Sequence, residues 1–252
     1  MKITLITVTY NAASVLPRTL DSIRHQTYQQ IEHLIIDGAS KDETVAIAET
    51  YRKECPYEVT ILSEPDKGLY DAMNKGLRKA TGDYLVFLNA GDTLHAADTL
   101  STLTSHLSHL TSPSPAVIYG DTAIVDNEGT FLHLRRLRPP RHLTWKSFRQ
   151  GMLVCHQAFY VRTDIARQEE YDLQYRHSAD VDWCIRVMKR AEQQQLPLVN
   201  TNEILADFLE GGDSTQNHRD SLKERFRVMR HHYGLLTTCV MHGWFVIRAF
   251  IK

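Results

Sequence analysis

The fold is decided first by the run Ile3-Thr4-Leu5-Ile6-Thr7-Val8, in which β-branched and large apolar residues follow one another without a charge. A run of this kind is typical of a strand that is buried on both faces of a parallel sheet. Apolar residues at helical spacing follow between residues 15 and 23, with Ser14 as the expected N-cap, and a second strand is expected at 33–36. A strand, a helix and a second strand in this order predict a right-handed crossover within a parallel sheet.

The same alternation continues to Asp92 and then loosens. We expect Asp42 to cap the second helix, and we expect further first-half elements at 59–62 (strand), 69–79 (helix) and 84–88 (strand). The pattern of the second half predicts a helix at 96–110, strands at 117–119, 131–137, 158–161 and 198–208, and helices at 181–192 and 219–233. We therefore expect an α/β fold in which helices flank a Rossmann-like, mainly parallel sheet, in a single domain.

Composition places the chain among ordinary globular proteins and excludes several classes of function. The 252 residues suffice for one large domain, and a net charge of −1 argues against a nucleic-acid partner. Four widely spaced cysteines without a Cys-x-x-Cys pair argue against a zinc or redox motif. The sequence contains no run of about 18 uncharged apolar residues, so we expect no transmembrane helix. Since no signal-peptide pattern is present either, we expect a cytoplasmic protein, or one at the inner face of the cell membrane.

Polar and acidic side chains stand where the predicted strands end. The first strand is followed by Thr9-Tyr10-Asn11, the second by Asp37, the third by Asp66 and the fourth by Asp92. Ligands of open parallel sheets bind outside the carboxyl ends of the strands, and acids that share such an edge need a cation or a donor-rich ligand. Each acid taken alone is as well explained as a turn or cap residue. Because neither a Gly-x-Gly-x-x-Gly motif nor a P-loop motif is present, we expect a nucleotide site built from acids and a metal.

Four motifs resemble the family 2 glycosyltransferases of the GT-A fold. Three of them are Thr7-Val8-Thr9-Tyr10-Asn11, the run 35–44 that contains Asp37-Gly38-Ala39-Ser40, and Glu64-Pro65-Asp66-Lys67-Gly68-Leu69-Tyr70-Asp71-Ala72-Met73-Asn74-Lys75-Gly76. The fourth, the run 80–92, resembles the strand that leads to the family's Asp-x-Asp-type metal motif. The resemblance is strongest to bacterial enzymes that build colanic-acid-like exopolysaccharide, capsule or O-antigen. It is strong across residues 1–92 and patchy beyond them.

The resemblance implies a nucleotide-sugar site within residues 1–92. Thr9, Tyr10 and Asn11 would line the base and ribose pocket, and Asp37 would accept a hydrogen bond from uracil. Asp66 and Lys67 would lie near the nucleoside and the diphosphate. The residues implied are Thr9, Tyr10, Asn11, Asp37, Asp66 and Lys67. The expected donor is therefore a UDP-sugar.

The resemblance also implies a divalent metal, Mg²⁺ or Mn²⁺, bound by Asp92 beside the phosphates. Such an ion would stabilise the departing diphosphate as the glycosidic bond breaks. The chain departs from the family pattern here, because Asn89 replaces the first acid and Gly91 precedes Asp92. His218 is the candidate for a second ligand, although a lone histidine is more often structural.

In the second half, Ser178-Ala179-Asp180-Val181-Asp182 resembles the segment that supplies the catalytic base of the family. The resemblance implies that Asp180 is the base, with Asp182 as the reserve, although alanine stands where the family often has glutamate. An acidic helix N-terminus, favoured by the helix dipole, is the structural alternative. His156 and Gln157 would face the acceptor, or else His156 is a buried, hydrogen-bonded residue.

These motifs predict an inverting, metal-dependent glycosyltransferase that moves a hexosyl or N-acetylhexosaminyl group to a hydroxyl of a saccharide or lipid-linked saccharide acceptor. Residues 1–92 would bind the donor, residues 93–234 would form the acceptor side of the same domain, and residues 235–252 would form an apolar and basic helix. That helix either lies in the membrane interface or docks on the protein. A nucleotidyltransferase lacks support, because Asn11-Ala12-Ala13-Ser14 replaces its Gly-rich loop. A non-catalytic sugar-nucleotide-binding protein of a polysaccharide assembly complex stays open as the alternative.

Overall fold

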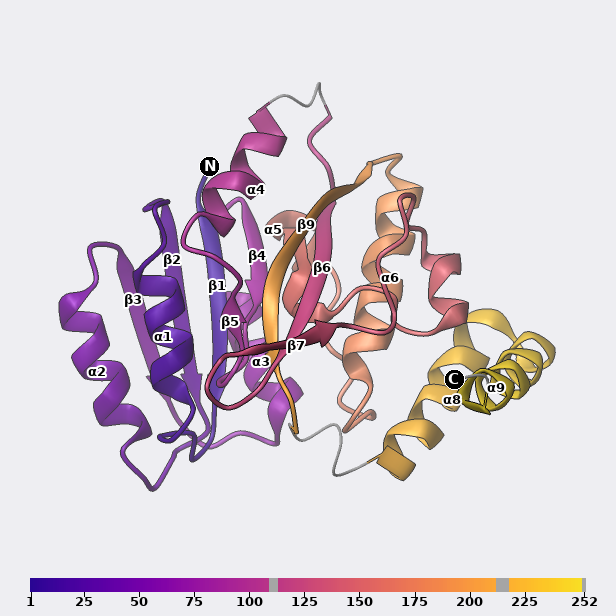
Figure 1. Ribbon diagram of the computed structural model, residues 1–252, viewed down its shortest axis with the longest axis horizontal. Helices are drawn as coiled ribbons and strands as arrows, with labels where there is room; N and C mark the ends of the chain where they lie inside the picture. The colour runs from indigo at the N-terminus through magenta and orange to yellow at the C-terminus, as the bar shows by residue number, and fades with distance from the viewer. Residues whose placement is uncertain (109–112, 212–217, 251–252) are drawn as a thin grey trace.

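A sheet of nine strands forms the core of the part of the chain that the computed structural model describes, residues 1–108, 113–211 and 218–250 (Figure 1). The side chains at 108, 218, 219, 249 and 250 are not described. Along the sheet the strands are β3 (Glu58–Ser63), β2 (Ile31–Asp37), β1 (Ile3–Thr9), β4 (Tyr84–Phe87), β8 (Phe159–Arg162), β6 (Val117–Val125), β9 (Leu198–Leu209) and β5 (Thr93–Leu94). The ninth strand, β7 (Phe131–Leu134), pairs with β6.

The first four strands are parallel neighbours, as their apolar runs predict. β1 pairs with β2 and with β4, and β2 pairs with β3. Successive residues of β1 face opposite sides of the sheet, so Ile3 and Leu5 join one apolar cluster while Ile6 and Val8 join another. Both clusters consist of buried side chains, and β1 is therefore a central strand that is covered on both faces.

Helices cover both faces of the sheet. α3 and α6 contribute to the cluster of Ile6 and Val8, whereas Ile23 of α1 and Leu103 of α4 belong to the other face. α1 and α2 share a third apolar cluster. The α-helices are α1 (Leu16–Arg24), α2 (Thr44–Glu54), α3 (Leu69–Lys79), α4 (Thr99–Ser108), α5 (Thr163–Ala166), α6 (Ala179–Gln193), α8 (His218–Tyr233) and α9 (Leu235–Phe250), and the 3₁₀ helices are η1 (Trp145–Gln150) and η2 (His156–Ala158).

The first half follows the sequence-based prediction closely, with one exception at a helix cap. α3 has the expected bounds, and β1 to β4 begin and end within about two residues of their expected positions. The expected cap Ser14 is wrong, because α1 begins after Val15, whose side chain makes no capping bond. Asp42 stands one residue before the N-cap of α2, and its carboxylate accepts the backbone N–H of Thr44 at 3.1 Å.

The second half completes the same sheet, so the chain is a single α/β domain. β8 pairs antiparallel with β4 and β6, and β6 pairs parallel with β9. β6 runs to Val125, well beyond its predicted end at 119, because β9 pairs with it along that length. β7 ends at Leu134, earlier than predicted. The expected fold class, a mainly parallel sheet flanked by helices, is confirmed.

The C-terminal helices lie at the end of the molecule opposite α2 (Figure 1). α9 packs against α8 and η1, and the rings of His242 and Phe226 meet at 5.0 Å between the two helices. Within the described ranges, the chain contains no helix with the length and apolar character needed to span a membrane.

Candidate active site

The carboxyl ends of β1, β2 and β3 meet at Asp37, which is buried. In the sheet register, Thr9 lies beside Asp37, and Ser63 lies on its other side. The carboxylate accepts hydrogen bonds from Thr9 Oγ1 at 3.0 Å and from Ser63 Oγ at 2.7 Å, and Ser40 donates two more, from its backbone N–H at 3.0 Å and from its hydroxyl at 2.5 Å. Burial opposes ionisation, but the bonds from Ser40 and Ser63 outweigh it and lower the pKa of Asp37. Asp37 is therefore an ionised acceptor at the ligand edge of the sheet.

Gly38 allows two further side chains to converge on this edge. A Cβ atom at Gly38 would lie 2.5 Å from Oδ2 of Asp66 and 3.3 Å from Cδ2 of Tyr10, so a larger residue would displace the Asp66 carboxylate. The Tyr10 side chain is 66% exposed. An exposed aromatic ring beside two carboxylates offers a stacking surface and hydrogen-bond acceptors, which is what a nucleoside base requires.

The backbone at this edge of the sheet is held in an unusual conformation. Asn11 and Ala39 have φ angles of 49° and 60°, in the left-handed region that side chains other than Asn and Gly rarely adopt. The Asn11 Oδ1 atom accepts the Lys41 N–H at 2.8 Å, and the Asn11 N–H donates to Ser40 Oγ at 2.8 Å. Backbone strain that is fixed by such bonds is common at ligand sites.

Asp66 and Lys67 lie on the turn between β3 and α3. Asp66 Oδ1 accepts the backbone N–H of Gly68 at 2.8 Å, and Gly68 has a φ of 116°, which favours glycine. The Lys67 side chain is exposed. Its ammonium group is therefore free to approach the phosphates of a ligand at this edge.

Asp92 lies buried in the turn after β4 and joins three segments of the chain. Its Oδ2 accepts a hydrogen bond from Gln157 Nε2 at 2.5 Å, and its Oδ1 accepts the Leu209 backbone N–H at 3.1 Å. Burial raises the pKa of Asp92 to about 7, although these two bonds oppose the change. The carboxyl group thus connects the turn after β4 with η2 and with the end of β9.

The residues near Asp92 fit a divalent metal only if the ligand supplies most of its coordination. Within residues 1–108, 113–211 and 218–250, no three His, Cys, Asp or Glu side chains are grouped so that they could hold an ion. Oδ1 of Asn89 is buried without a hydrogen-bond partner, and oxygen is the ligand atom that Mg²⁺ and Mn²⁺ prefer. Asp92 would have to exchange one of its two bonds for the ion. The side chain of His218 lies outside the described residues.

Asp180 lies in the first turn of α6 with a half-buried carboxylate. The Tyr70 hydroxyl donates to its Oδ1 at 3.2 Å, and the Val181 N–H donates to the same atom at 2.9 Å. Burial and the charge of Asp180 raise the pKa of Tyr70 far above its usual value, so its hydroxyl remains a donor. Tyr70 follows the turn of Asp66 and Lys67, and its bond therefore brings Asp180 to the part of the sheet edge where that turn lies.

Asp182 faces the opposite way and is enclosed in an ionic network. Its Oδ2 lies 2.7 Å from Nε of Arg186, and its Oδ1 lies 2.8 Å from Nε2 of His232 on α8. Burial alone would raise the pKa of Asp182, but the hydrogen bond from His232 and the charge of Arg186 outweigh it and lower the pKa. Asp182 thus fastens α6 to α8, whereas Asp180 lies at the sheet edge.

His156 and Gln157 are buried beneath the site. The His156 ring stacks on Phe87 with centroids 5.3 Å apart, and its Nε2 has no hydrogen-bond partner in the described structure. Burial lowers the pKa of His156, although the charge of Asp180 opposes this. Gln157 is fully occupied, because it donates to Asp92 and accepts from Cys155 Sγ at 2.8 Å. Neither side chain presents surface to an acceptor in this structure, and acceptor contact by these two residues stays a prediction.

Two features of the site escaped the sequence analysis. Tyr70 could have been proposed as a site residue from the sequence, because it stands inside the long motif 64–76. Its partner Asp180 is 110 residues away, so the bond between them could not. No feature of the sequence pointed to the bond between Gln157 and Asp92, since the two residues lie 65 positions apart in segments without a shared motif.

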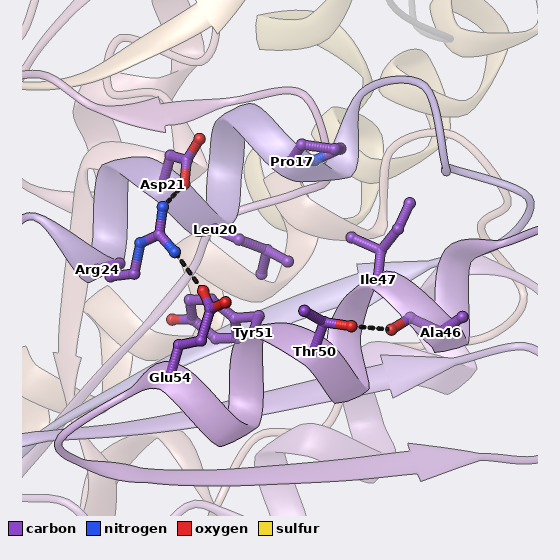
Figure 2. A pocket seen from close by; sticks show the side chains of 9 residues that line it. All are labelled: Pro17, Leu20, Asp21, Arg24, Ala46, Ile47, Thr50, Tyr51 and Glu54. Atoms are coloured by element: carbon purple, nitrogen blue, oxygen red, sulfur yellow. Dashed lines mark hydrogen bonds and ion pairs between the residues drawn. The ribbon is translucent and has the colours of Figure 1, made fainter.

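A hollow of about 330 Å³ lies away from this site, between α1 and α2 (Figure 2). Apolar side chains of both helices line it, and Arg24 closes one end by pairing with Asp21 at 2.6 Å and with Glu54 at 2.5 Å. None of the residues at the sheet edge described above lines it, and it is a groove between two packed helices.

Comparison with known proteins finds relatives of this chain. The model of the family described as glycosyl transferase family 2 matches residues 4–169. A PGL/p-HBAD biosynthesis glycosyltransferase of Mycobacterium bovis is 38% identical over 186 residues, which are 72% of this chain and 68% of the relative. The amylovoran biosynthesis glycosyltransferase AmsB of Erwinia amylovora is 30% identical over 190 residues, which are 71% of this chain and 62% of the relative.

Solved structures of glycosyltransferases have the same fold. TarS 1–349 of S. aureus in complex with UDP-GlcNAc gives a TM-score of 0.73 at 18% identity, over 91% of this chain and 65% of that chain. The mannosyltransferase PcManGT of Pyrobaculum calidifontis, in complex with GDP-Man and Mn²⁺, gives a TM-score of 0.63 at 15% identity, over 100% of this chain and 76% of that chain. At these identities the likeness concerns the fold alone, which is the GT-A fold.

Proposed function

We propose, from the premise that this chain belongs to glycosyl transferase family 2, that it moves a sugar from a UDP-sugar to a hydroxyl of a saccharide or lipid-linked saccharide acceptor. Membership of the family makes it a glycosyltransferase, and relatives named for PGL/p-HBAD and amylovoran biosynthesis support a role in building cell-surface carbohydrate. The observation that carries the proposal is the bond between Tyr70 and Asp180, which brings a carboxylate to the same edge as Tyr10, Asp37 and Asp66.

The donor site would recognise the nucleoside through Tyr10 and Asp37. The exposed Tyr10 ring supplies a stacking surface, and the ionised Asp37 accepts an N–H of the base, as uracil provides. Because Asp37 already accepts hydroxyl hydrogens from Thr9 and Ser63, the base would displace one of these bonds. A bound UDP-GlcNAc in TarS and a bound GDP-Man in PcManGT support a nucleotide-sugar donor without deciding the base.

A divalent ion, Mg²⁺ or Mn²⁺, would be held by Asp92 and by phosphate oxygens of the donor, with Oδ1 of Asn89 as a further candidate ligand. When bound, such an ion supplies positive charge that stabilises the departing diphosphate. Lys67 would add a second positive charge from the turn after β3. The Mn²⁺ in PcManGT supports this part of the proposal.

Asp180 would act as the general base of an inverting reaction. Its Oδ1 is held by Tyr70, and its Oδ2, which has no hydrogen-bond partner among the described residues, would take the proton of the acceptor hydroxyl. The hydroxyl oxygen then attacks the anomeric carbon from the face opposite the diphosphate, which leaves with the electron pair of its bond to that carbon. A positioned carboxylate base contributes about 10²–10⁴-fold to such a step.

A binding experiment tests the proposal before any acceptor is known. We expect UDP together with Mn²⁺ to raise the melting temperature most within a panel of nucleoside diphosphates and nucleotide sugars, because a ligand of the folded state alone stabilises it. A clear preference for GDP or TDP would overturn the donor assignment. Tight UDP-sugar binding without hydrolysis or transfer to any saccharide would favour the alternative, a non-catalytic sugar-nucleotide-binding protein.

A further inference from the structure

α9 presents a broad apolar face to solvent. No Asp, Glu, Lys or Arg lies between Leu235 and Ile247. The exposed fractions are 85% for Leu236, 70% for Val240, 47% for Trp244 and 52% for Ile247. These four side chains follow one another at intervals of three or four residues, and they therefore line one side of the helix.

The opposite side of α9 is fixed to the protein. His242 meets the ring of Phe226 on α8, and Arg248 donates from Nη1 to the Gln150 carbonyl at 3.2 Å. Nη2 of Arg136 donates to the Arg248 carbonyl at 2.8 Å. The inner side of α9 thus packs against the protein, and the apolar side chains of its outer face do not take part in that packing.

Three exposed basic side chains, Arg136, Lys146 and Arg149, accompany this face, whereas Arg138 of the same segment is paired with Asp121. The segment 135–150, which touches α9 through Arg136 and η1, contains six basic residues and no acid. Lys146 and Arg149 of η1 are exposed, as is Arg136, and α9 itself contains no Asp or Glu. An apolar helix face with basic side chains beside it complements an anionic bilayer, in which acyl chains lie below a layer of negative head groups.

We propose that α9 docks this protein on an anionic lipid bilayer. Leu236, Val240, Trp244 and Ile247 enter the interface, and the exposed side chains of Arg136, Lys146 and Arg149 lie among the head groups. The proposal rests on the proposed function in one respect. If the acceptor is a lipid-linked saccharide, docking on the bilayer brings the protein to its acceptor.

A second copy of the chain fits this face less well than a lipid surface does. In a symmetric dimer the same patch meets itself, so Arg136, Lys146 and Arg149 of one copy would approach their own counterparts. Like charges facing each other across an interface oppose association. Anionic head groups neutralise the same charges, and the bilayer therefore satisfies both the apolar and the basic part of the surface.

The docking surface is connected to the site through α8. His232 of α8 is bonded to Asp182 on α6, and Asp182 is two residues from Asp180. Figure 1 shows α8 and α9 on the α6 side of the sheet, away from α1 and α2. A bilayer in contact with α9 would therefore face the acceptor half of the molecule.

Vesicle flotation with the full chain tests the docking. We expect the protein to float with phosphatidylcholine vesicles that contain phosphatidylglycerol and to float far less with phosphatidylcholine alone, with binding weakened by salt.

The double variant Val240→Glu/Trp244→Glu should lose at least tenfold in vesicle binding. The matched control is Leu132→Glu on β7, which places a charge on an equally available apolar residue and should bind as the parent does. The UDP-induced rise in melting temperature should be equal in all three proteins, so a failure of docking is distinct from a failure of the proposed function.

Tryptophan fluorescence gives a second measurement on the same proteins. Trp183 is buried and Trp145 is stacked on Tyr233, so a blue shift on adding anionic vesicles should come from Trp244 and disappear in Trp244→Phe. The proposal is overturned if the parent does not float, if neutral and anionic vesicles bind it equally, or if the double variant still floats. It is also overturned if the parent forms a dimer that Val240→Glu abolishes and does not bind vesicles.

Discussion

At the scale of single residues, the site is defined by two carboxylates with opposite surroundings. Asp180 and Asp182 belong to the same helical turn, yet only Asp182 is enclosed by the Arg186 guanidinium and by the imidazole of His232, whose pKa is lowered by burial. Asp180 has two neutral donors, the Tyr70 hydroxyl and the Val181 N–H, which orient the carboxylate without neutralising it. A carboxylate in that state can still accept a proton from a substrate, whereas Asp182 is committed to holding two helices together.

Replacing Asp180 by Asn tests the base directly. Asp180→Asn keeps the shape but removes the basicity, so we expect the transfer rate to fall by about a hundredfold or more. UDP-sugar affinity, measured by isothermal titration calorimetry, and the melting temperature should stay near the parent values.

Asp182→Asn is the matched control on the same helix. It should lower transfer less but reduce the free energy of unfolding by about 1–3 kcal/mol, because Arg186 and His232 lose their charged partner. The reverse ranking in activity would move the role of base to Asp182, and full activity in both variants would place the base elsewhere.

At the scale of elements, β2 is joined to its neighbours by a buried histidine. Nε2 of His33 meets Thr7 Oγ1 on β1 at 3.0 Å, and its Nδ1 meets the Tyr51 hydroxyl on α2 at 2.9 Å. The ring of Tyr51 also packs edge-on against it, with centroids 5.4 Å apart. Burial lowers the pKa of His33 from 6.5 to about 3, so the folded protein keeps this ring neutral.

Acid should therefore destabilise the sheet through His33. Below a pH of about 6.5 the unfolded chain binds a proton that the folded chain refuses, so the free energy of unfolding falls as the pH decreases towards 3. The contribution of His33 has a slope of up to about 1.4 kcal/mol per pH unit. In urea unfolding at pH 7, 6 and 5, the free energy of unfolding should change less with pH for His33→Gln than for the parent. The exposed His25→Gln serves as control and should follow the parent, and equal slopes for all three proteins would contradict the assignment.

At the scale of the whole molecule, Asp92 connects the first half of the chain with the second half. The turn that carries it follows β4, and its partners Gln157 and Leu209 belong to η2 and to the end of β9. The same carboxylate is the proposed protein ligand of the divalent ion. Stability and metal binding are therefore two separate consequences of one side chain, and they can be measured apart.

Asp92→Asn removes the charge while keeping the size of the side chain. We expect Mn²⁺ to lose its effect on UDP affinity in calorimetric titrations, and we expect unfolding to become easier by about 1–3 kcal/mol because a buried donor loses its acceptor. Gln157→Ala is the control, since it removes a partner of Asp92 but leaves the carboxylate, and it should keep the Mn²⁺ effect. An Asp92→Asn protein that is less stable yet retains the Mn²⁺ effect would show that Asp92 serves only as a structural link.

The sequence by itself determined the first half of the fold. β1 to β4 and α3 follow from local patterns, because burial of a strand on both faces and an apolar stripe on a helix are both written in neighbouring residues. The acids at the strand ends and the membership of glycosyl transferase family 2 were equally accessible, since the motif 64–76 is contiguous in the chain.

Only the tertiary structure decided how the second half serves the site. The difference between Asp180 and Asp182 depends on His232, which lies 50 residues beyond Asp182, and the burial of Asp92 depends on Gln157, 65 residues away. The length of β6 was likewise decided by its pairing with β9, from which it is separated along the chain by the strands β7 and β8 and by several helices. The physical reason is the same in each case: a carboxylate takes its charge state, and an irregular strand its length, from partners that only folding brings near, and no local pattern records such a partner.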